Sequence, residues 1–186
     1  MLKAISLLIV ASLALAGPEY TESGDMKFPQ HYREWIYLSS GMDMSYEPAA
    51  QKGPDHAFDN VFVDPDSYKA FLATGHWPDK TMLILEVRAG ESKGSINQSG
   101  NFQGELQAIE MHVKDTARFK GGWAFYSFNG TKPGKLLPQT ASCYSCHEEH
   151  GAVDSTFVQF YPTLLPIATS KRTLARSYLA EEAARK

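Results

Sequence analysis

The chain has few of the residues that several protein classes need. Its 186 residues include only two cysteines, Cys143 and Cys146, too few for a disulfide-rich scaffold. Basic residues are not in excess, because 18 Lys and Arg stand against 21 Asp and Glu and the formal charge is -3. Nucleic-acid binding requires a basic surface, so no nucleic-acid partner is expected. The length is that of one domain, and 12% aromatic residues is too many for a disordered chain.

The only long apolar run lies near the N-terminus. Lys3 precedes an apolar stretch over residues 4–15, and Ala14-Leu15-Ala16 precedes Gly17. This order is typical of a secretory signal peptide, here residues 1–16, whereas a membrane anchor would need about 20 apolar residues. We therefore expect a chain that starts near Gly17, has no membrane span after signal removal and, if the signal is bacterial, works in the periplasm.

The pattern along the chain places strands in the middle and helices towards both ends. Strands are predicted at residues 58–63, 81–89, 105–113 and 122–128, and loops at 42–55 and 90–104. Helices are predicted at residues 29–38, at 65–73 with Asp64 as N-cap and Gly75 as stop, around the cysteines, and over 170–186. This is an α+β pattern with an antiparallel sheet of about four or five strands and flanking helices.

Cys143, Cys146 and His147 form the pentapeptide CxxCH. The two thiols lie one helical turn apart, as addition to the two vinyl groups of a haem requires, and the adjacent histidine ligates the iron. A thioredoxin-like redox pair would sit in a parallel β-α unit, and a zinc site completed by His150 would have adjacent ligands. A disulfide is sterically awkward across two residues of a helix. Together with the export signal, the motif predicts one covalent haem c on the C-terminal segment.

The sixth iron position has no obvious ligand in the sequence. No methionine follows Met111, so a Met ligand would have to come from far upstream, from Met42, Met44, Met82 or Met111. The other histidines are interpreted singly as surface or hydrogen-bonded residues, and they are His31, His56, His76, His112 and His150. His150 shares a helical face with His147. These observations predict an open distal position, where small molecules bind.

Several short motifs occur in a specific order along the chain. They are Tyr32-Arg33-Glu34-Trp35, Val63-Asp64-Pro65 with Tyr68, Val113-Lys114-Asp115 with Arg118-Phe119, Trp123-Ala124-Phe125-Tyr126, the CxxCH, and Phe160-Tyr161-Pro162. The set resembles cytochrome P-460 and its relative cytochrome c′-beta. The resemblance implies a haem-binding domain over residues 29–165, preceded by an N-terminal extension at 17–28 and followed by a helical tail at 166–186. It also implies a homodimer and one haem c held by Cys143, Cys146 and His147, with a vacant distal side.

The resemblance implies two functional branches. In the P-460 branch a lysine is cross-linked to the haem and hydroxylamine is oxidised, whereas in the c′-beta branch the cross-link is missing and the haem binds nitric oxide and similar gases. The family's lysine immediately precedes a glutamate, here Glu86, and that position is Leu85. Leucine has no nucleophile, so the c′-beta branch is favoured.

Glu110 falls where the hydroxylamine-oxidising members have a carboxylate beside the substrate. Strand alternation places Leu106, Ala108, Glu110 and His112 on one face, so Glu110 is a candidate distal base, and pairing with water or a lysine is the alternative. The first hypothesis is a periplasmic protein that binds nitric oxide or similar gases at a five-coordinate iron. The alternatives are an enzyme that oxidises hydroxylamine or nitric oxide, and a plain electron carrier with a redox partner protein.

Overall fold

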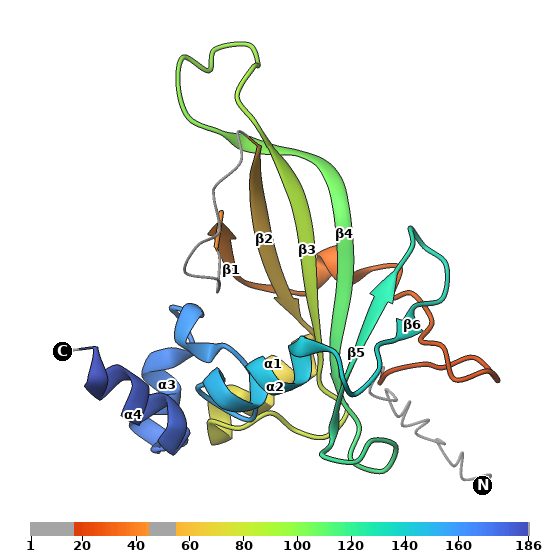
Figure 1. Ribbon diagram of the computed structural model, residues 1–186, viewed down its shortest axis with the longest axis vertical. Coiled ribbons are helices and arrows are strands. Elements are labelled where there is room, and N and C mark those ends of the chain that lie inside the picture. Colours follow the sequence, from red (N-terminus) through yellow and green to blue (C-terminus); the bar gives the residue numbers. More distant parts are fainter. Residues whose placement is uncertain (1–16, 45–54, 186) are drawn as a thin grey trace, which may run out of the picture.

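The structure is a computed structural model, and it describes residues 17–44 and 55–185 (Figure 1). The predicted signal peptide at residues 1–16 and residues 45–54 of the predicted loop lie outside the described residues.

A six-stranded antiparallel sheet forms the centre of the molecule, with its strands in chain order. The strands are β1 (Ile36–Met42), β2 (His56–Val63), β3 (Met82–Glu91), β4 (Phe102–Lys114), β5 (Trp123–Phe128) and β6 (Lys135–Leu136). All four predicted strands are confirmed, and the α+β class with them. The sheet has more strands than the four or five expected, because β1 and β6 gave no clear local signal.

The predicted helix at residues 29–38 is wrong. Only a single 3-10 turn, η1 (Tyr32–Glu34), forms there, and β1 begins at Ile36. Ile36 pairs with Val63 in the ladder to β2, and the Tyr32 ring packs edge-on against Phe62 with 5.9 Å between centroids. Ladder pairing and contacts with a distant strand therefore override the local helical spacing.

The helices gather around one end of the sheet, while β3 and β4 continue beyond them into a protruding hairpin (Figure 1). They are α1 (Pro65–Thr74), α2 (Ser142–His150), α3 (Leu165–Lys171) and α4 (Arg176–Ala184), with the short η2 (Val158–Phe160). The prediction for α1 is confirmed, since the Asp64 side chain accepts from the Ser67 N–H at 2.8 Å and Gly75 ends the helix at a φ of 77°. Within residues 17–44 and 55–185 no helix is long and apolar enough to cross a membrane.

Each face of the sheet has its own hydrophobic core, because successive strand side chains alternate between the faces. Val63 and Leu83 face the helical layer and pack with Phe71 and Trp77. Their neighbours in sequence belong to the opposite core, which also contains Met26 from the N-terminal segment. Met26 is bound to the sheet by backbone hydrogen bonds with Gly134. Residues near Met26 thus cover the second face, and the cavity described below opens on the first.

Glu86 lies on the second face and is fully buried. Its carboxylate accepts hydrogen bonds from Tyr32 Oη and Arg33 Nη1 at 2.5 Å, from Arg88 Nε at 2.7 Å and from Asn60 Nδ2 at 3.2 Å. Burial opposes ionisation of Glu86, but the hydrogen bonds from Arg88 and Tyr32 and the charge of Arg33 lower its pKa to about 2. The ionised carboxylate ties η1 and β2 to β3 at the residue next to Leu85.

Replacing Glu86 with Gln should destabilise the protein by about 2–3 kcal/mol at pH 7, because two arginines lose their anion. A depressed pKa contributes stability above the unfolded value of 4.5 that is lost as pH falls towards about 2. The difference between wild type and Glu86→Gln in urea unfolding should therefore shrink across that range. The control is Glu105→Gln, an exposed residue of β4. An equal loss of stability at pH 7 and pH 2 would contradict the ionic role of Glu86.

Candidate functional site

Helix α2 carries the CxxCH motif and is fastened to the sheet by Tyr144. Both Cys143 and Cys146 are free thiols and half-buried, and burial raises the pKa of each. The Tyr144 hydroxyl accepts from the Phe125 N–H at 3.3 Å and donates to the Leu137 carbonyl at 3.1 Å. Tyr144 occupies one of the two variable positions of the CxxCH pattern, so the motif did not predict that this residue anchors α2 to the sheet.

The His147 imidazole is set in one tautomer by a backbone carbonyl. Its Nδ1 lies 2.9 Å from the Ser155 carbonyl oxygen, so Nδ1–H donates and Nε2 keeps its lone pair. Burial lowers the pKa of His147 to about 4, although the hydrogen bond to Ser155 acts in the opposite direction. The ring is therefore neutral at pH 7, with Nε2 ready to bind a metal.

The carbonyl of Ser155 comes from a tight turn held by Trp77. Asp154 and Ser155 have φ values of 47° and 55°, in the left-handed region, and the Thr156 N–H donates to the Val153 carbonyl at 2.8 Å. The Trp77 indole donates to Thr156 Oγ1 at 2.8 Å, and its backbone N–H donates to Asp154 at 2.9 Å. A fully buried tryptophan thus positions the hydrogen-bond partner of His147.

Aromatic rings fix the plane of the His147 ring. Phe157 packs against it with 4.1 Å between centroids, and His112 and Phe125 approach edge-on at 4.7 Å and 4.8 Å. His112 is itself stacked on Phe125 at 4.1 Å and packs at a tilt against Trp123 at 4.3 Å. These rings hold His112 beside His147 and the cavity.

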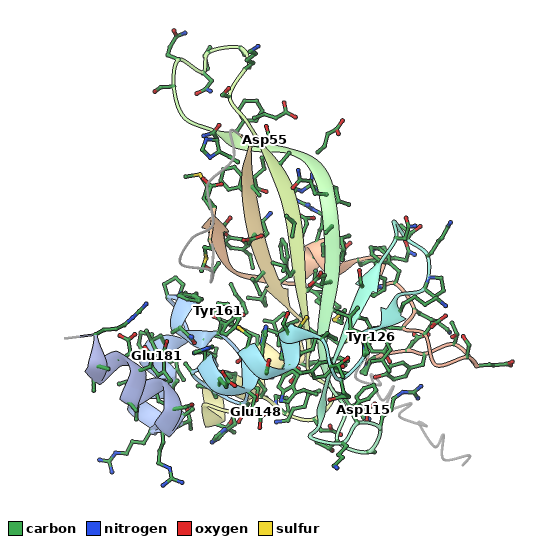
Figure 2. All side chains as sticks on the ribbon, viewed as in Figure 1. Asp55, Asp115, Tyr126, Glu148, Tyr161 and Glu181 are labelled. Carbon is green, nitrogen blue, oxygen red and sulfur yellow. The ribbon has the colours of Figure 1, made fainter. Side chains whose placement is uncertain are left out.

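A mainly apolar cavity lies in front of His147, and two of the predicted site residues meet there. Leu85 and Glu110 are direct cross-strand partners and both line it, as the predicted strand alternation requires. Other residues that line the cavity are Met44, Asp59, Val61, Leu83, His112 and Tyr161. In Figure 2 Tyr161 lies where the helical layer meets the sheet, and Glu181 lies out on α4. The cavity is formed by strands β1–β5 and the segment around η2.

Four of the five remaining histidines have the hydrogen-bonded or surface roles predicted for them. His31 lies 3.2 Å from Glu34, His56 2.6 Å from Asp43, His76 3.1 Å from Asp154 and His150 3.2 Å from Glu181. His112 departs from the prediction, because its Nε2 is buried and has no hydrogen-bond partner in the described part of the chain. Burial, and then the neighbouring His147, lowers the pKa of His112 well below its ordinary value, so the ring is neutral.

These features fit a haem c. Two thiols lie one helical turn apart on α2, and a neutral histidine with a free Nε2 follows them directly. The cavity in front of that histidine has the apolar walls that a porphyrin needs. His112 Nε2 is a buried polar atom that no described residue satisfies, and a group bound in the cavity, or a water beside it, would supply the partner.

A model of the Cytochrome P460 family matches residues 29–158. The chain belongs to the Cytochrome P460 family. A search of curated proteins found no match. The matched range includes Leu85, Glu110 and the whole CxxCH, and it ends before α3 and α4. Membership in the Cytochrome P460 family implies haem c as the cofactor, and the site described above has residues suited to hold it.

Sequence reasoning missed Asp59, which lines the same cavity from β2. The signal was present, since Asp59 is the only charged residue of the predicted strand 58–63 and alternates with Val61 and Val63. Of the four methionines considered as sixth ligands, Met44 and Met111 line the cavity. Met111 is fully buried and belongs with Met82 to the core on the opposite face, whereas Met44 is partly exposed.

We expect both cysteines to carry the haem. In acidified acetone the wild-type holoprotein should keep its haem, and the double variant Cys143→Ala, Cys146→Ala should release it. Each single variant should retain one thioether, which mass spectrometry of haem peptides resolves. Ser145→Ala is the matched control on the exposed side of α2 and should behave as wild type. Haem extracted by acetone from the wild type would show that the thiols do not hold it.

Proposed function

We propose that this member of the Cytochrome P460 family is an exported mono-haem c-type cytochrome that binds nitric oxide or similar small molecules at an open iron position. The observation that carries the proposal is the cavity in front of His147, because Leu85 lines it and no lysine is among its described lining residues. When bound, the haem would supply an iron atom that can take a small ligand.

The residues around the cavity have separate tasks in this proposal. His147 would ligate the iron through Nε2, in the orientation set by Ser155 and the Phe157 ring. Val61, Leu83 and Leu85 form an apolar wall that keeps bulk water away from the ligand. Glu110, whose pKa is raised by burial and then by Asp59, is the polar group on this wall.

Two observations support the alternative functions, an oxidising enzyme and an electron carrier. Glu110 lies in the cavity without a basic partner among the described residues, which favours proton transfer and hence the oxidation of hydroxylamine or nitric oxide. Met44 lines the cavity, which favours a six-coordinate electron carrier with a redox partner protein. The periplasmic location rests on the signal-like residues 1–16, and the homodimer rests on the resemblance alone.

Carbon monoxide separates an open iron from a six-coordinate carrier. The ferrous wild-type protein should change its Soret spectrum fully on addition of carbon monoxide, and Met44→Ala should bind the gas with an affinity within about 2-fold of wild type, as expected for a residue that is not a ligand. The contrary result is a wild type that does not bind carbon monoxide and a Met44→Ala variant that does. It would favour the electron carrier, with Met44 as the sixth ligand.

In this proposal Leu85 prevents the lysine cross-link that the resemblance implies for the P-460 branch, and Leu85→Lys tests its placement. A lysine there would enter the cavity, and its bond to a haem carbon removes two electrons and two protons, so the ferric variant is treated with hydrogen peroxide as oxidant. Mass spectrometry should find a third bond between the chain and the haem in Leu85→Lys and none in wild type or in Leu85→Met. A variant without that bond would mean that position 85 does not face the haem edge.

A further inference from the structure

Two carboxylates enter the cavity from different strands. Asp59 lies on β2 and Glu110 on β4, with β3 between them. Asp59 is the register partner of Val87, and Glu110 is the register partner of Leu85, two residues earlier on the same strand and on the same face. Both carboxylates line the cavity, so they reach it from the two sides of β3.

Neither carboxylate has a hydrogen bond or an ion pair with another residue in the described ranges 17–44 and 55–185. The fully buried acids in the part of the chain that the structure describes are all satisfied. Glu86 accepts from two arginines, Asp115 from Lys80, and Asp64 from two backbone N–H groups. A half-buried, unpaired carboxylate is costly for the fold, and such groups concentrate at functional sites.

The surroundings disfavour the charge of both groups. Burial raises the pKa of Asp59, and the charge of Asp43 adds to the effect. Burial likewise raises the pKa of Glu110, and there the added charge is that of Asp59. Two interacting carboxyls that each disfavour the other's ionisation release their protons in separate steps, so the pair keeps one proton to a higher pH than an isolated carboxyl would.

We propose that Asp59 is a second distal carboxylate, and that Asp59 and Glu110 together accept the proton of small protic ligands that bind the iron as anions. The inference rests on the proposed haem site and names the class of ligand that this site favours. For a ligand H–X the proton moves to a carboxylate oxygen and X⁻ is left to bind, with no change in electron count. Diatomic gases, which carry no proton, would not use the pair.

A route for the accepted proton to solvent leads from Asp59 through Asp43. Asp43 is close enough for its charge to raise the pKa of Asp59, and its carboxylate lies 2.6 Å from His56 Nδ1. The His56 side chain is 40% exposed and meets water. Other titratable groups at or near the cavity are His112 on β4, Cys143 and His147 on α2, and Tyr161 after η2. Burial keeps His112, Cys143 and His147 in their neutral forms at pH 7.

Hydrogen cyanide binding to the ferric holoprotein tests the pair, with carbon monoxide binding to the ferrous form as the reference that needs no proton acceptor. The cyanide association rate of wild type should fall at acid pH with a midpoint above the ordinary carboxyl range. Asp59→Asn should move this midpoint down, because Glu110 loses its anionic neighbour, and Glu110→Gln should do the same for Asp59. The double variant should lose the pH step and bind cyanide at least about 10-fold more slowly than wild type at pH 7.

Controls separate this role from a structural one. Asp59→Glu should keep the pH step, and Asp55→Asn, at the far end of the sheet in Figure 2, should match wild type. Carbon monoxide affinity is measured for every variant beside the cyanide rate, because a general change of the cavity alters both, whereas loss of the proton acceptor lowers the cyanide rate more. Two results would contradict the role of the pair and leave the proposed function intact. One is an unchanged midpoint of the cyanide rate in Asp59→Asn, and the other is a wild-type cyanide rate in the double variant, each in protein that binds carbon monoxide. A wild type that does not bind carbon monoxide overturns the proposed function, and the pair with it.

Discussion

The hydrogen bond from His147 Nδ1 to the Ser155 carbonyl is the interaction on which the rest of the site depends. It fixes which imidazole nitrogen is free, and together with Phe157 it fixes where that nitrogen points. The carbonyl is itself held by a turn that Trp77 fastens through Thr156 and Asp154. A motif of five consecutive residues thus obtains its geometry from a tryptophan some 70 positions earlier, in the core between helices and sheet.

The alternation of β3 gives two adjacent residues opposite tasks. Leu85 faces the cavity, whereas Glu86 faces away and is bound by two arginines, Tyr32 and Asn60. A shift of register by one residue would place an ionised carboxylate in the cavity and a leucine among guanidinium groups. Such a shift would leave buried charges unpaired, so the polar network on one face secures the apolar wall on the other.

Features carried by short stretches of sequence were predictable, and features made by contacts between distant segments were not. Asp64, Pro65 and Gly75 define α1 locally, and the CxxCH predicted a helix with two thiols beside a histidine. The helix predicted at residues 29–38 failed because pairing with β2 decides the conformation of β1. The burial of His112 depends on rings from β5 that no local pattern brings to it. The alternation of residues 58–63 could have placed Asp59 on the cavity face, but its proximity to Glu110 on β4 follows only from the order of the strands in the sheet.

Leu85 influences the cavity electrostatically as well as by lacking a nucleophile. It stands directly opposite Glu110, where cross-strand side chains lie about 5 Å apart at Cβ. A lysine at this position would be a cation within reach of Glu110, and an adjacent cation typically lowers a carboxyl pKa by about 1–3 units. Leucine offers no such charge, so burial and Asp59 act on Glu110 unopposed and raise its pKa. Leucine at position 85 thus offers neither the nucleophile that a lysine cross-link would need nor a cation beside Glu110, and both differences from the lysine-bearing pattern have one physical origin.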